Sequence, residues 1–128
     1  MRATHKSLIL FGLSAVLGAL VWFLSPWFTG HREPWDADSL FYHSGLLVAG
    51  FIPACFSARR FWLWALGAWL GQVLAFFVLL LRFQSGPLWL VGLFFLSIYA
   101  LFSLAGAAVG AGVRYFFCRH VSDATKVA

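Results

Sequence analysis

The densest group of side chains that could do chemistry in this sequence lies in residues 29–39 and just after them. Two histidines, three carboxylates and one arginine gather there: His31, Arg32, Glu33, Asp36, Asp38 and His43. Imidazole and carboxylate groups are common ligands of divalent metal ions. Their spacing matches no standard metal motif, so we predict a solvated loop in which Arg32 pairs with an acid. A metal site remains the alternative.

The same residues could instead collect a cation at the mouth of a transport pathway, with Glu33 or Asp36 above Arg82 and His43. Proton-coupled pathways usually continue through ionisable side chains inside the membrane. The long apolar stretches of this chain carry no charged residue. This argues against a proton-coupled transporter that acts alone.

Enzyme motifs are missing from the sequence. Serine and histidine residues occur, but there is no G-x-S-x-G elbow and no glycine-rich nucleotide loop. Cys55 and Cys118 show none of the spacings that are typical of zinc sites. We therefore predict no catalytic residues and no cofactor.

The elements that must position these residues are membrane helices. The chain has 128 residues, of which 62% are hydrophobic and only 10% are charged, whereas about a quarter of the residues in a soluble domain are charged. This composition argues against a soluble enzyme, a disordered chain and a disulfide-built secreted domain. It favours an integral membrane protein.

Four apolar stretches predict the helices, because a bilayer core of about 30 Å needs roughly 20 apolar residues for each span. They are Ser7–Phe28, Leu40–Ala58, Phe61–Leu81 and Leu88–Val113. The second is the weakest, and an interfacial or re-entrant segment is its alternative. The short connections between them predict an all-α, four-helix antiparallel bundle that forms a single domain.

The distribution of Lys and Arg predicts the orientation. With both termini inside, seven basic residues lie on the inner side and two, Arg32 and Arg82, on the outer side. We therefore predict an N-in/C-in protein. Its compact design without a cleavable signal suits a bacterial inner membrane, with a eukaryotic membrane as the alternative. The scattered positive charges suit anionic lipid and predict no nucleic-acid partner.

Small residues predict where helices approach closely, because burial alone does not drive association in lipid. Gly67 and Gly71 form one pair in the third span, and Gly106 and Gly110 form another in the fourth. Each pair lies in a stripe of small residues. These stripes predict close helix contacts, either within one chain or between chains.

One polar side chain lies in the middle of a span. Gln72 is central in the third span, and Tyr99 lies at the same depth if the third and fourth spans form a hairpin. An unpaired amide in hydrocarbon costs several kcal/mol. We therefore predict that Gln72 is hydrogen-bonded to Tyr99, with a position lining a water or substrate pathway as the alternative.

These observations favour a non-catalytic structural or accessory subunit that packs through its third and fourth spans, as a homo-oligomer or within a larger membrane complex. The alternative is an oligomeric transport or channel component that uses the outer polar loop as its entry site.

Overall fold

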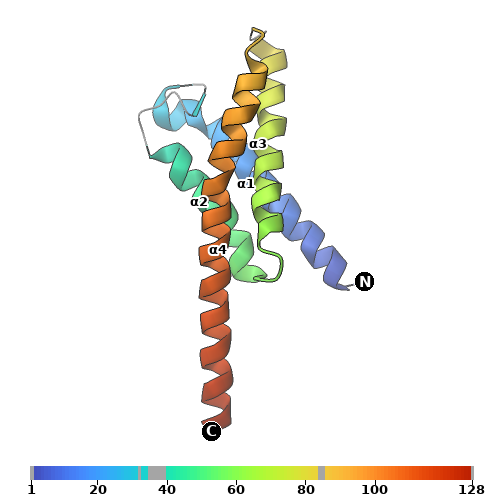
Figure 1. The fold of residues 1–128 in the computed structure, drawn as a ribbon, viewed down its shortest axis with the longest axis vertical. Helices are drawn as coiled ribbons and strands as arrows, with labels where there is room; N and C mark the ends of the chain where they lie inside the picture. The colour runs from blue at the N-terminus through green and yellow to red at the C-terminus, as the bar shows by residue number, and fades with distance from the viewer. Residues whose placement is uncertain (1, 32, 35–39, 84–85, 128) are drawn as a thin grey trace.

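The computed structural model describes residues 2–31, 33–34, 40–83 and 86–127, and within them it contains four α-helices and no strand (Figure 1). The helices are α1 (Arg2–Thr29), α2 (Phe41–Phe56), α3 (Trp62–Phe83) and α4 (Trp89–Val127). The prediction of an all-α protein is confirmed. The end of α4 was not predicted, since the helix continues 14 residues past Val113.

Three of these helices, α1, α3 and α4, are long and apolar enough to cross a membrane. Helix α2 has 16 residues, which gives a length of about 24 Å, less than the roughly 30 Å of the hydrocarbon core. The coarser prediction of an integral membrane protein is therefore supported. A fourth crossing by α2 stays a prediction.

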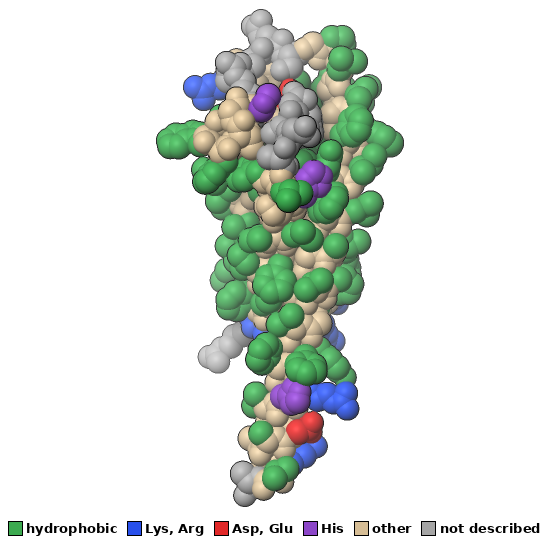
Figure 2. Space-filling view, turned by 90° about the vertical axis from the view of Figure 1, so that its left-hand side faces the viewer, with side chains coloured by type: hydrophobic (Ala, Val, Ile, Leu, Met, Phe, Trp, Pro, Cys, Tyr) green, Lys and Arg blue, Asp and Glu red, His purple; other side chains and the backbone are tan. Residues whose placement is uncertain are grey.

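The distribution of side chains on the surface fits a bilayer. Figure 2 shows hydrophobic side chains over the middle of the molecule, while charged side chains lie toward its two ends. Large apolar residues such as Leu74, Leu81 and Phe94 are more than half exposed. Hydrocarbon is the solvent that such a surface requires.

Successive helices run in opposite directions, and both termini lie at the same end of the bundle (Figure 1). The closest helix pairs, however, are not neighbours in sequence. Helix α1 packs most extensively on α3, and α2 packs most extensively on α4. The short connections therefore set the direction of each helix, but they do not choose its main packing partner.

Glycines form the centre of both of these contacts. A Cβ atom at Gly18 or Gly71 would overlap the backbone of the other helix of the α1–α3 pair, and the same holds for Gly50 and Gly106 in the α2–α4 pair. Absence of a side chain lets two backbones touch, which strengthens van der Waals packing in a membrane.

Polar contacts hold the turns and crossings in place. The hydroxyl of Ser14, fully buried on α1, donates to the carbonyl oxygens of Ala49 on α2 and Trp64 on α3. At the turn between α2 and α3, the Trp64 indole donates to Ser57 O at 2.7 Å. Arg114 donates to Cys55 O at 3.0 Å, which satisfies a carbonyl that the end of α2 leaves without a helical partner.

Candidate functional site

The four glycines predicted to mediate helix packing all lie in contacts within the chain. Gly67 and Gly71 face α1, where a Cβ atom would meet the backbone of Phe11 or Ala15. Gly106 and Gly110 face α2 instead. The small-residue stripes of α3 and α4 therefore do not pack against each other, and these glycines do not lie on a surface open to a partner protein.

Gln72 has a hydrogen-bond partner, but it is not the predicted one. The hydroxyl of Tyr42 donates to Gln72 Oε1 at 2.6 Å, and both side chains are almost completely buried. Tyr99 instead lies beside Tyr42, with ring centroids 4.8 Å apart. Equal depth relates only α3 to α4, whereas the first turn of α2 brings Tyr42 between them.

Aromatic rings surround this buried polar pair. The Trp22 ring meets Tyr42 edge-on at 6.5 Å and Phe76 edge-on at 5.7 Å. The amide nitrogen of Gln72 itself has no hydrogen-bond partner among the described residues. The Tyr42–Gln72 hydrogen bond thus joins α2 to α3 inside a buried, aromatic environment.

The predicted outer-loop residues do not form a single cluster in the described part of the chain. His43 is half-buried between the rings of Tyr99 and Phe102, at centroid distances of 5.4 Å and 4.7 Å. His31 is exposed, and Ser25 donates to its carbonyl oxygen at 3.0 Å. Arg32, Asp36 and Asp38 lie outside the described residues.

Among the residues that are described, no three His, Cys, Asp or Glu side chains lie close enough to hold a metal ion. The residues proposed for the metal site are His31, Glu33, Asp36 and His43, and because Asp36 falls outside the described set, the metal alternative stays a prediction. His31 and Glu33, which are described, do not belong to any such group of three ligands.

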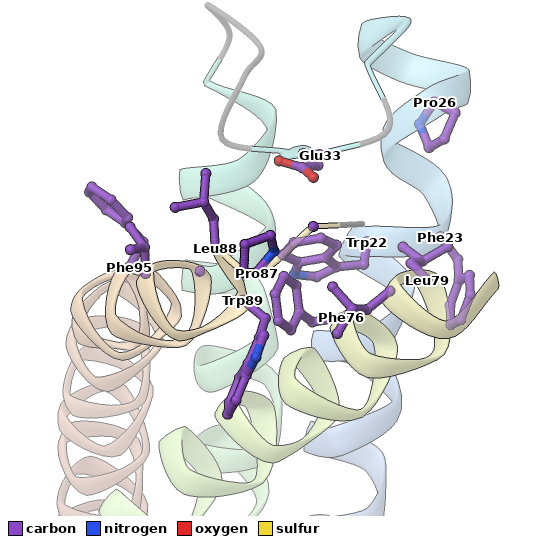
Figure 3. Close-up of a pocket in the computed structure, with 14 residues that line it drawn as sticks. Trp22, Phe23, Pro26, Glu33, Phe76, Leu79, Pro87, Leu88, Trp89 and Phe95 are labelled. Atoms are coloured by element: carbon purple, nitrogen blue, oxygen red, sulfur yellow. The ribbon is translucent and has the colours of Figure 1, made fainter. Parts of the chain in front are cut away.

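A cavity of about 720 Å³ opens at the loop end of the bundle. The last turns of α1, the last turns of α3 and the first turns of α4 form its walls (Figure 3). Trp22, Phe76, Trp89 and Phe95 contribute aromatic rings to the lining. We call this cavity the outer groove.

Glu33 brings one carboxylate to the outer groove, and it is the one ionisable side chain in the described lining. In Figure 3 the carboxylate lies over Trp22 and Pro87 at one end of the groove. Trp22 connects the two features of the site, because its ring contacts Tyr42 and also lines the groove. The site therefore combines a buried polar pair with an apolar cavity that has an acidic edge.

Several of these residues could have been found from the sequence. Gly18 lies near Ala15, and Gly50 lies beside Ala49, so α1 and α2 also carry clusters of small residues that predict close contacts. Tyr42 stands near the start of the second apolar stretch, where aromatic residues commonly mark the membrane boundary, so its position in the sequence does not predict a buried partner for Gln72. The outer groove leaves no local pattern in the sequence, because three separate helix ends build it.

Comparisons with protein-family models, with curated proteins and with solved structures found no match. The function must therefore be argued from the site itself.

Proposed function

We propose that this protein is a non-catalytic accessory subunit of a membrane complex and that α4 is its docking helix. The observation that supports this most strongly is the exposed C-terminal part of α4. Every residue from Tyr115 to Val127 is exposed, and this part of the helix extends well beyond the rest of the bundle (Figure 1).

Helix α4 is too long for the core of a bilayer to cover all of it. A helix of 39 residues is about 58 Å long, nearly twice the thickness of a bilayer core. An isolated helix of fewer than about 12–15 residues is marginally stable in water. Tyr115, Phe116 and Phe117 are each more than 60% exposed on the extension, so contact with another protein would stabilise it.

The outward face of α4 supplies a second surface for the partner. Ala105, Ala108 and Gly112 are exposed on α4, and a Cβ atom at Gly112 would meet nothing within 4 Å. Small residues let a neighbouring helix approach closely, as they do at the two crossings inside the chain. A transmembrane helix of the partner is therefore the proposed occupant of this face.

The proposed location is a bacterial inner membrane, with both termini in the cytoplasm. The start of α1, the turn between α2 and α3 and the end of α4 lie at one end of the bundle (Figure 1). These three segments carry seven of the nine Lys and Arg residues. The positive-inside rule then assigns that end, including the α4 extension, to the cytoplasm.

An oligomeric transport component is the alternative function. The outer groove would be its entry site, with Glu33 at the mouth. Gln72, for which a pathway-lining position is the alternative to a structural hydrogen bond, is fully buried and does not line this groove. The accessory role is therefore the better supported of the two.

Two variants test the accessory role. The protein is purified from its native membrane in mild detergent, and the mass of the assembly is measured for the full chain and for a chain that ends after Arg114, which lacks the whole extension. We expect the truncation to release the partner while the helical circular dichroism of the bundle is kept. Ala108→Leu should also weaken the association, and Val78→Leu, on the exposed face of α3, is its control.

A full-length chain that purifies alone as a monomer would contradict the accessory role, and an assembly that survives both changes would rule out α4 as the docking helix. An assembly made only of this chain would favour the homo-oligomer. Gly71→Leu and Gly110→Leu are not suitable for this experiment, because both glycines face helices of the same chain.

A further inference from the structure

The outer groove has the size of a ligand site, and the proposed accessory role does not use it. Its volume of about 720 Å³ falls within the roughly 300–1,000 Å³ that is usual for pockets binding small molecules. Such pockets typically combine mostly apolar walls with a few polar groups that fix the orientation of the ligand. The outer groove matches this description.

The walls determine the body of the ligand. Trp22 and Phe76 are almost completely buried at the base of the groove, whereas Trp89 and Phe95 are partly exposed. Trp22 and Phe76 also hold each other edge-on, so this part of the groove is formed without a ligand. A preformed apolar wall favours an alkyl chain or an aromatic ring.

The one carboxylate in the described lining determines the other end of the ligand. Glu33 is half-buried at the edge of the groove, so an anionic group placed there would be repelled. A positively charged amine would instead gain a charge-assisted hydrogen bond. The ring of Trp89, which is partly exposed, also attracts cations.

We propose that the outer groove binds a lipophilic amine, with its apolar body between the ends of α1, α3 and α4 and its ammonium group at the Glu33 carboxylate. Such a ligand would enter from the lipid or from the aqueous side of the headgroup layer. The groove then discriminates by charge among amphiphiles that share one apolar body: an amine binds more tightly than an alcohol, and an alcohol more tightly than a carboxylate.

The experiment measures the binding of radiolabelled dodecylamine, dodecanol and dodecanoate to the full chain in phosphatidylcholine nanodiscs at neutral pH. Empty nanodiscs give the partition into lipid, which is subtracted. We expect the amine to bind about tenfold more tightly than the alcohol, as charge-assisted hydrogen bonds predict. Glu33→Gln should remove this difference and leave the affinity for the alcohol unchanged.

Matched variants separate the ligand site from general effects. Asp123→Asn removes the same charge from the far end of α4 and should change nothing. Val91→Trp adds bulk at a residue that lines the groove, whereas Val109→Trp adds the same bulk at a comparably exposed position of the same helix that does not line it. Val91→Trp should weaken the binding of both the amine and the alcohol about tenfold, and Val109→Trp should not.

Two results would overturn the proposal. Equal affinity of the wild-type protein for the amine and the alcohol would show that the groove does not select charge. Loss of amine binding in Asp123→Asn to the same extent as in Glu33→Gln would show that only net charge matters. Thermal unfolding of each variant, followed by circular dichroism, identifies any loss of binding that comes from misfolding. If Glu33→Gln misfolds, Glu33→Asp replaces it. This variant keeps the carboxylate and is expected to keep the preference for the amine.

Discussion

A single methyl group on Gly110 should loosen the crossing of α2 and α4. A Cβ atom built there lies 2.5 Å from Phe51 O and 3.0 Å from the Ala54 Cβ atom, whereas ordinary contacts begin at 3.4 Å. The carbonyl oxygen must therefore move away by about 0.9 Å, the difference between 2.5 Å and 3.4 Å. Because this atom belongs to the backbone, the helix has to move with it.

The cost follows from that displacement. A gap of about 0.5–1 Å loses roughly a quarter to a half of the dispersion energy of each contact, and extra methyl groups in packed cores typically cost about 1–3 kcal/mol. For Gly110→Ala we expect a loss of about 2–3 kcal/mol in the free energy of unfolding. Tryptophan fluorescence during reversible unfolding in mixed detergent micelles, with increasing sodium dodecyl sulfate, measures it.

Gly112→Ala is the matched control, because Gly112 lies on the same helix and a Cβ atom there meets nothing within 4 Å. Alanine favours a helix more than glycine does, by up to about 1 kcal/mol, so this variant should be unchanged or slightly more stable. If both alanine variants unfolded at the same detergent fraction, the close contact between α2 and α4 would be refuted.

Three further predictions use the same unfolding assay. Gly71→Ala should destabilise the α1–α3 crossing by about 2–3 kcal/mol, while Gly12→Ala, in open space, should not. Tyr42→Phe removes the hydroxyl that donates to Gln72 and should cost about 1–3 kcal/mol; adding Gln72→Leu should recover part of this loss, and additive effects would contradict the hydrogen bond. Ser14→Ala removes a buried hydroxyl that donates to two backbone carbonyls and should cost about 0.5–1.5 kcal/mol; an unchanged midpoint would contradict those contacts.

The helices could be predicted from the sequence because hydrocarbon imposes one strong rule. A long apolar run can satisfy its backbone only as a helix or a closed barrel, and these runs are too long for the strands of a barrel. The end of α4 was missed because Arg114 marks the boundary of the membrane, whereas nothing in the sequence from Tyr115 to Val127 stops a helix.

The candidate site was harder to predict, because each contact within it depends on a third helix. Gln72 is recognisable as a buried polar residue from its place in an apolar run, but its partner depends on which helix reaches it. Tyr42 comes from α2 and donates to it, whereas the predicted partner, Tyr99, contacts Tyr42. The depths of residues on α3 and α4 alone do not reveal a partner that comes from α2.

The same reasoning explains why α1 pairs with α3, and α2 with α4. Lipid gives no hydrophobic drive for two apolar helices to associate, so close approach of their backbones decides which pairs form. In the first pair, Gly18 on α1 faces the backbone of α3 and Gly71 on α3 faces the backbone of α1. Gly50 on α2 and Gly106 on α4 face each other's helix backbones in the same way in the second pair. Pairs with glycine on both helices approach most closely, and they prevail over pairs that are adjacent only because a short loop joins them. These glycines are thus used inside the chain, and the docking face proposed on α4 depends on a different one, Gly112, whose Cβ position meets nothing within 4 Å.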